Sequence, residues 1–174
     1  EHESRNRYDA EWRDWIVERY GSLENAEKDW GFAAPRDENG QVTNPLGKQT
    51  YEDGEWRRMV AAYRRFLDVL LYERYNAVRR WCKEADPNHV VSFRMAEAGN
   101  PTFRWDKALP FDFAYLAGAV DILEPEAYGR IGDWEKVKPG RFEYEYARWA
   151  NPALPMMWAE MGTSVWVESR GTAP

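Results

Sequence analysis

The sequence is short of the residues on which many metal sites, catalytic triads and disulfide frameworks depend. It has two histidines, His2 and His89, and one cysteine, Cys82. A single cysteine cannot form an internal disulfide, and so few histidines disfavour a zinc site or a histidine-based triad. We also find no phosphate-binding glycine loop and no dinucleotide fingerprint. Metal-dependent and nucleotide-dependent functions are therefore poor interpretations of this sequence.

An excess of positive charge and a long apolar run are also missing. The chain has 24 Lys and Arg against 30 Asp and Glu, for a formal net charge of -6 and a pI near 5.1. Nucleic acids and anionic membranes select for basic faces, and a membrane span requires about 20 consecutive apolar residues. The sequence therefore predicts no nucleic-acid partner and no membrane partner. The compartment, secreted or cytoplasmic, stays open.

Aromatic residues are abundant instead, with ten Trp and ten Tyr among 174 residues. A flat ring with a polar edge suits the apolar face of a sugar, although about half of these rings are explained by packing alone. The length fits one domain covering residues 1–174, large enough to bury a substantial core.

Helical periodicity predicts five helices. Ser22 is a suitable N-cap for the second, which Gly31 ends. In the longest helix, Val78, Trp81 and Cys82 continue the apolar stripe, so we expect them to be buried, and we expect its arginines to face solvent. We also expect Tyr8 to share one face of the first helix with Trp12 and Trp15, and Trp149 in the last helix to face inward. The predicted ranges are 8–20, 22–30, 55–83, 112–118 and 141–150, with a loop at 32–53 that could wall a cleft.

Three short apolar segments alternate with the later helices and read as strands, near 89–95, 120–124 and 155–160. Strands joined by helical crossovers form right-handed βαβ units, so the sequence predicts a parallel sheet and an α/β fold. Their ends carry Arg94, Glu126 with Tyr128, and Glu160. Because the carboxyl ends of parallel strands meet at one edge, these side chains are expected to form a site. The plainer alternative is that Glu160 only pairs with a nearby arginine.

At these residues the chain resembles a known group of enzymes. Trp158-Ala159-Glu160-Met161-Gly162, its order after Glu126-Ala127-Tyr128-Gly129, and the segment 19–26 with Trp30-Gly31 resemble the clan A glycoside hydrolases, especially family 5-like enzymes and family 42 β-galactosidases. The resemblance implies a (β/α)8 TIM barrel, of which this chain covers the portion after strand four through strand seven. It also implies a longer polypeptide, with the remainder of the barrel supplied by the same or another chain.

The resemblance assigns roles as well. Glu160 would be the nucleophile and Glu1 the acid/base, with Glu3 as its competitor. Tyr128 matches the tyrosine that hydrogen-bonds the nucleophile, whereas Glu126 stands where the clan often has histidine. The remaining expected substrate-binding residues are Arg94, which would keep Glu160 ionised, Asn100 and Trp158.

Together these features predict a glycoside hydrolase that cleaves β-linked O-glycosidic bonds of a carbohydrate substrate with two carboxylates and no metal or organic cofactor, and the resemblance implies a retaining mechanism. A catalytically silent carbohydrate-binding barrel is the alternative, because it would keep the aromatic surfaces without the acid/base. A structural or interaction domain, with Glu160 exposed and unpartnered, is a third interpretation.

Overall fold

The computed structural model describes residues 2–45, 47–50, 52–95, 112–127, 141–157 and 160–161. These residues belong to two compact units. The first unit comprises residues 1–67 with 105–109, and the second comprises 68–104 with 110–174. Helix α3 (Arg57–Ala85) continues from one unit into the other, so each unit is described by itself below.

The first unit begins with helices α1 (His2–Tyr20) and α2 (Leu23–Trp30), separated by a two-residue turn. Gly21 adopts a positive φ of 79°, and the Ser22 Oγ accepts a hydrogen bond from the Asn25 backbone N–H at 3.1 Å. Gly31 ends α2 in the left-handed conformation, with φ of 66°. These are the start and stop signals that the sequence predicts for this helix.

Aromatic rings form the core of the first unit. Trp12 is fully buried and its ring centroid lies 5.4 Å from that of Trp15 and 5.7 Å from that of Trp30. Tyr63 and Phe66, from the beginning of α3, complete the contacts to Trp12 at 5.3 and 5.5 Å. Tryptophan therefore acts here as packing, which is the plainer explanation of part of the aromatic excess.

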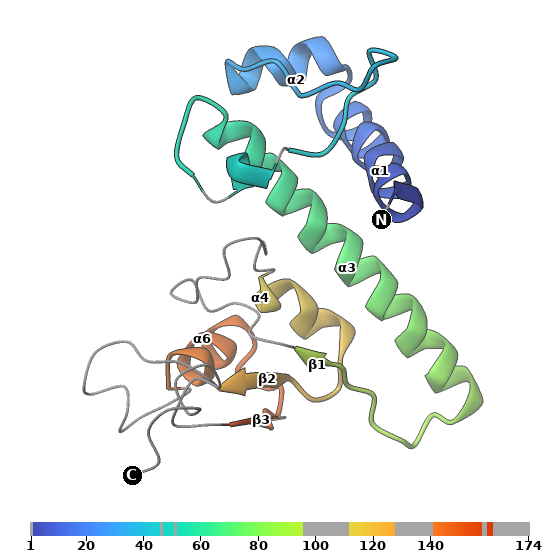
Figure 1. Cartoon of the computed structure of the whole chain (residues 1–174). Helices are drawn as coiled ribbons and strands as arrows, with labels where there is room; N and C mark the ends of the chain where they lie inside the picture. Colours follow the sequence, from blue (N-terminus) through green and yellow to red (C-terminus); the bar gives the residue numbers. More distant parts are fainter. Residues whose placement is uncertain are drawn as a thin grey trace, which may run out of the picture. The chain divides into compact units, whose positions relative to one another are not determined.

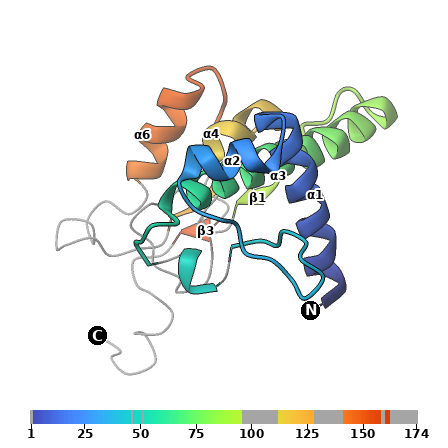
Figure 2. The same cartoon turned by 90° about the horizontal axis from the view of Figure 1, so that it is seen from above.

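The segment that follows α2 runs back alongside α1 (Figure 2). Asp9 is buried and accepts the Asn44 backbone N–H at 2.6 Å, and the Arg13 Nη1 donates to the Val42 carbonyl at 2.8 Å. An isolated antiparallel bridge joins Arg36 to Val42, and a short 3-10 helix follows at Gly47–Thr50. Because its backbone groups are paired in this way, the segment is part of the first unit's structure rather than a loose excursion.

The second unit contains a three-stranded parallel sheet in the order β1-β2-β3, with helices between successive strands (Figure 1). The strands are β1 (Arg94–Met95), β2 (Glu124–Ala127) and β3 (Glu160–Met161). Between β1 and β2 lie α4 (Phe113–Leu116) and a 3-10 turn (Ala117–Ala119), and between β2 and β3 lies α6 (Arg141–Ala150).

The core of the second unit is formed by residues that precede the strands and by the helices that pack on them. Leu116, Val120 and Leu123 are buried, and half-buried side chains from the helices and strands pack against them: Leu71, Tyr75, Phe93, Tyr146, Leu154 and Met156. Leu116 is the last residue of α4, while Val120 and Leu123 lie in the segment immediately before β2. The apolar residues just before each strand therefore pack against the helices. The polar residues follow them in the sequence, within the strands.

The parallel, adjacent arrangement predicted for the three strands is confirmed. All five predicted helices are present within two or three residues of their predicted ends, except that α1 begins earlier, at His2. The strands are shorter than predicted and begin later, although a parallel bridge between Leu123 and Met156 extends the contact between the second and third segments.

Several burial predictions are wrong. Trp81 is 66% exposed, Val78 is 37% exposed and Cys82 is exposed, whereas the stripe on α3 predicted all three to be buried. Periodicity reports which side of a helix is apolar, but not where along the helix the core ends. The core contacts of α3 in this unit stop near Tyr75, so the last turns project beyond them.

Other side chains depart from their predicted environment for related reasons. Trp149 is 75% exposed, because it stacks on the outer side of Tyr146 at 5.6 Å and leaves Tyr146 to contact the core. Tyr8 is 40% exposed, since the aromatic core centres one turn later, on Trp12. Arg79 does not face solvent as predicted, because it pairs with Asp121.

Within the described ranges, no helix is both long enough and apolar enough to cross a membrane.

Candidate functional site on three parallel strands

The structure brings three of the predicted site positions to neighbouring strands of one sheet. Arg94 lies in β1, Glu126 in β2 and Glu160 in β3. In the register of the sheet, Glu126 is the direct partner of Glu160. The backbones of these two residues therefore lie side by side, about 4.8 Å apart in the hydrogen-bonding direction.

Arg94 occupies a different level of the sheet. Its register partner on β2 is Glu124, two residues before Glu126. Two residues of a strand span about 6.6 Å, so the Arg94 backbone lies about 6.6 Å, measured along the strands, from the level of Glu126 and Glu160. A long side chain can cover that distance, but the contact of Arg94 with Glu160 stays a prediction.

The other predicted site residues lie outside the described residues. They are Glu1, Asn100, Tyr128 and Trp158. The predicted hydrogen bond from the Tyr128 hydroxyl to the Glu160 carboxylate therefore stays a prediction, as does the role of Glu1 as acid/base.

A charged cluster fixes the opposite end of the same sheet. The Asp121 Oδ1 accepts hydrogen bonds from Nη2 and Nε of Arg79 at 2.6 and 3.1 Å, and its Oδ2 accepts the Val91 backbone N–H at 2.8 Å. Lys83 Nζ lies 2.8 Å from the same Oδ2. Asp121 thus ties the end of α3 to the segments that lead into β1 and β2, and so sets where both strands begin.

The cluster also shifts the protonation of its carboxylate. Partial burial opposes ionisation of Asp121, but hydrogen bonds from Lys83, Arg79 and the Val91 N–H outweigh it and lower the pKa of Asp121 from 3.8 to about 2. The Asp121 carboxylate is fully paired, and it lies before β2 and not at the carboxyl end of that strand. Its role is therefore structural.

A second polar cluster lies at the start of α4. The buried Asp68 Oδ1, from α3, accepts the Asp112 backbone N–H at 2.8 Å, and the Asp112 Oδ1 accepts the Tyr146 hydroxyl at 2.8 Å. Burial, the hydrogen bond to Asp112 and the two negative charges raise the pKa of Tyr146 to about 12. This cluster joins α3, the start of α4 and α6, the helices that alternate with the strands of the sheet.

The sequence analysis did not predict the side-chain pairings in either cluster. Asp121 did carry a signal, since a carboxylate in an apolar strand segment requires a cation, and Arg79 and Lys83 share one helix face at i and i+4. Nothing in the sequence indicated which cation would reach it, because Arg79 and Asp121 are 42 residues apart. The contacts of Asp68 and Tyr146 with Asp112 are equally remote, at 44 and 34 residues.

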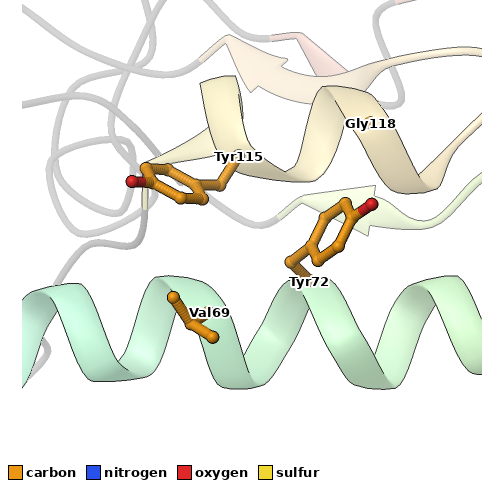
Figure 3. Close-up of a pocket in the computed structure, with 4 residues that line it drawn as sticks. All are labelled: Val69, Tyr72, Tyr115 and Gly118. Atoms are coloured by element: carbon orange, nitrogen blue, oxygen red, sulfur yellow. The ribbon is translucent and has the colours of Figure 1, made fainter. Parts of the chain in front are cut away.

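A hollow of about 410 Å³ lies between α3 and the α4 region, lined by Val69, Tyr72, Tyr115 and Gly118 (Figure 3). Its walls are two tyrosine rings, and a methyl group on Gly118 would come within 3.0 Å of the Tyr72 ring. Among its described lining residues there is no carboxylate, imidazole or amine, so what it offers a ligand is mainly apolar contact with the two tyrosine rings. In the described part of the chain, no group of three or more His, Cys, Asp or Glu side chains could hold a metal ion.

One comparison with known proteins bears on this arrangement. The chain is similar in structure to an agarase of known crystal structure, with a TM-score of 0.55 and 16% sequence identity. The likeness covers 88% of this chain and 19% of the agarase chain. No family model matches the sequence, and no curated protein matches it.

Proposed function

Starting from a glycoside hydrolase-like fold, shared with about a fifth of an agarase chain, we propose that the protein is a glycoside hydrolase built on a (β/α)8 barrel. A strand followed by a helix is the repeating unit of such a barrel, and the second unit has three parallel strands in sequential order with a helix between each successive pair. The described part of the second unit supplies strands five to seven in this proposal, in keeping with the clan A resemblance of the sequence.

The observation that carries the proposal is the register of Glu126 with Glu160. Enzymes with this barrel place catalytic groups where the strands end, and glycoside hydrolysis requires two carboxyl groups near one bond. Two glutamates in register on adjacent strands are a costly arrangement for a purely structural sheet edge, because like charges opposite each other repel. A site that uses the charges gives a reason for placing them together.

In this proposal Glu160 attacks the anomeric carbon and forms a glycosyl-enzyme intermediate. Glu1, or Glu3, protonates the leaving oxygen and then deprotonates the water that releases the sugar. Tyr128 and Arg94 keep Glu160 ionised through a hydrogen bond and an opposite charge. Glu126 contributes a third carboxylate, and Asn100 and Trp158 contact the sugar.

The substrate we propose is a β-linked carbohydrate, and the agarase likeness makes agarose the first polysaccharide to test. The abundance of Trp and Tyr and the net negative charge both favour a neutral, ring-stacking ligand over an anionic one.

The direct experiment is a substrate screen of the natural polypeptide that contains this chain. Release of reducing sugar would be measured from agarose, and release of phenol from a panel of aryl β-glycosides. Turnover of at least one substrate is expected. Binding to agarose without turnover of any substrate would favour the silent carbohydrate-binding barrel, and neither binding nor turnover would remove the carbohydrate assignment.

A further inference from the structure

The last turn of α6 exposes a tryptophan that the sequence predicts to face inward. Trp149 is 75% exposed, although tryptophan is highly buried on average in folded proteins. The side chains next to it on the outer side of the helix are charged. Glu145 lies one turn earlier and Arg148 immediately before it, and both are exposed. Trp149 therefore presents a flat apolar ring that is bordered by charges.

The Trp149 ring is held in place from behind. It stacks on the Tyr146 ring, with 5.6 Å between the ring centroids and an angle of 23° between the ring planes. Tyr146 contacts the core of the second unit, and its hydroxyl donates to the Asp112 Oδ1 at 2.8 Å. One side of the Trp149 ring is thus supported, while most of the ring is exposed. A ligand that stacks on it has little side-chain freedom to remove, which lowers the cost of binding.

The cation beside Trp149 is also held in place. Arg148 Nη1 donates to the Tyr144 hydroxyl at 2.9 Å, and the guanidinium carbon lies 5.6 Å from the centroid of the Tyr144 ring. A guanidinium carries only hydrogen-bond donors, and the carboxylate of Glu145 carries only acceptors. We refer to Glu145, Arg148 and Trp149 together as the Trp149 platform.

This combination suits a neutral sugar. The hydroxyl groups of a sugar both donate and accept hydrogen bonds, so they match a donor and an acceptor of opposite charge, while the apolar face of the sugar ring matches the indole. A protein partner fits less well, because the centres of protein interfaces are depleted of charged residues. An anionic partner is disfavoured by the net charge of -6.

The platform is separate from the candidate site. The segment after α6 leads into β3, and there the Pro155 carbonyl accepts the Leu123 backbone N–H at 2.9 Å and Met156 forms a bridge with Leu123. Trp149 therefore lies near the approach to β2 and β3, whereas Glu126 and Glu160 lie further along those strands. A sugar on the platform is not the sugar whose bond is cleaved.

We propose that the Trp149 platform is a second carbohydrate-binding site, which holds a neutral sugar residue of a polysaccharide away from the reacting bond. The choice of a carbohydrate rests on the proposed function, but binding at the platform requires no hydrolysis.

Retention by insoluble polysaccharides tests the proposal. The natural polypeptide that contains this chain would be mixed with agarose, cellulose or galactan, and the bound fraction would be measured after sedimentation over a range of polysaccharide concentrations. Trp149→Ala is expected to weaken binding to the polysaccharide that retains the unsubstituted protein by about tenfold, because a stacking surface is removed. Trp149→Phe keeps a ring and should retain most of the binding.

Trp81→Ala is the matched control, because Trp81 is also a largely exposed tryptophan, at 66%, on a different helix. It should leave retention unchanged. Turnover of a small aryl β-glycoside should be unchanged in Trp149→Ala, because that substrate does not reach the platform.

Three results would overturn the proposal: no retention of the unsubstituted protein by any of the three polysaccharides, unchanged retention of Trp149→Ala, or an equal loss in Trp81→Ala. Weaker retention of Trp149→Ala by a protein that turns over no substrate would remove the glycosidase assignment and leave the platform. Turnover with unchanged retention of Trp149→Ala would do the reverse.

Discussion

Asp121 joins three segments of the second unit through its two carboxylate oxygens. Arg79 and Lys83 approach it from α3, and the Val91 N–H approaches it from the segment before β1. Its side chain is only 17% exposed, so these interactions are weakly screened by water. The residue therefore contributes to stability in a way that depends on pH.

We expect Asp121→Asn to lower the free energy of unfolding by about 2 kcal/mol near neutral pH, because the native pKa of Asp121 is lowered from 3.8 to about 2. A lowered native pKa adds stability that is complete above pH 4 and is lost as the pH falls towards 2. The difference between the unsubstituted protein and the variant should therefore shrink across that range. Urea denaturation at a series of pH values measures it.

Asp53→Asn is the matched control, because Asp53 pairs with Arg57 at 3.1 Å with side chains 73 and 69% exposed. Exposed pairs contribute little, so we expect a change below about 0.5 kcal/mol. An equal loss in both variants would mean that the Asp121 cluster is no more than an ordinary surface ion pair.

At the scale of elements, helix α2 is short enough for its caps to matter. It has eight residues, from Leu23 to Trp30, and it places Trp30 against Trp12. We expect Ser22→Ala to cost about 1 kcal/mol, because the Asn25 N–H loses its side-chain acceptor, and Ser22→Asp to retain most of the stability. Thermal unfolding of the two variants makes the comparison, and equal losses would count against the capping role.

Local signals in the sequence predict the elements well. Ser22 and Gly31 bound α2 as their chemistry requires, and periodicity locates α3 and α6. What they do not predict is which side chains are covered. Trp81 and Cys82 follow the apolar period of α3, yet no core reaches them, since burial depends on elements far away in the sequence.

The candidate site divides in the same way. Alternating strands and helices predict the parallel sheet, and therefore that Glu126 and Glu160 lie on neighbouring strands. The register that sets them side by side could not be read from the sequence, because it depends on how each crossover helix packs. The pairing of Asp121 with Arg79 could not be predicted either, because it also depends on how a helix packs on the sheet.

At the scale of the whole molecule, the proposed function rests on a parallel sheet, two glutamates in register and a fold shared with part of an agarase. The central claim is that these parts form a glycosidase site with Glu160 as nucleophile. A nucleophilic carboxylate must be ionised and must form the covalent intermediate, whereas a neighbouring carboxylate that only shapes the site need not.

The most direct measurement is the turnover of an activated aryl β-glycoside by Glu160→Gln and Glu126→Gln variants of the natural polypeptide. The amide of glutamine cannot replace the attacking carboxylate, so we expect Glu160→Gln to abolish hydrolysis, with a loss on the order of 10³-fold or more, while folding and sugar binding persist. Glu126→Gln, its register partner, should lower activity less. Near-native turnover by Glu160→Gln would contradict the nucleophile assignment and leave the resemblance as one of fold alone.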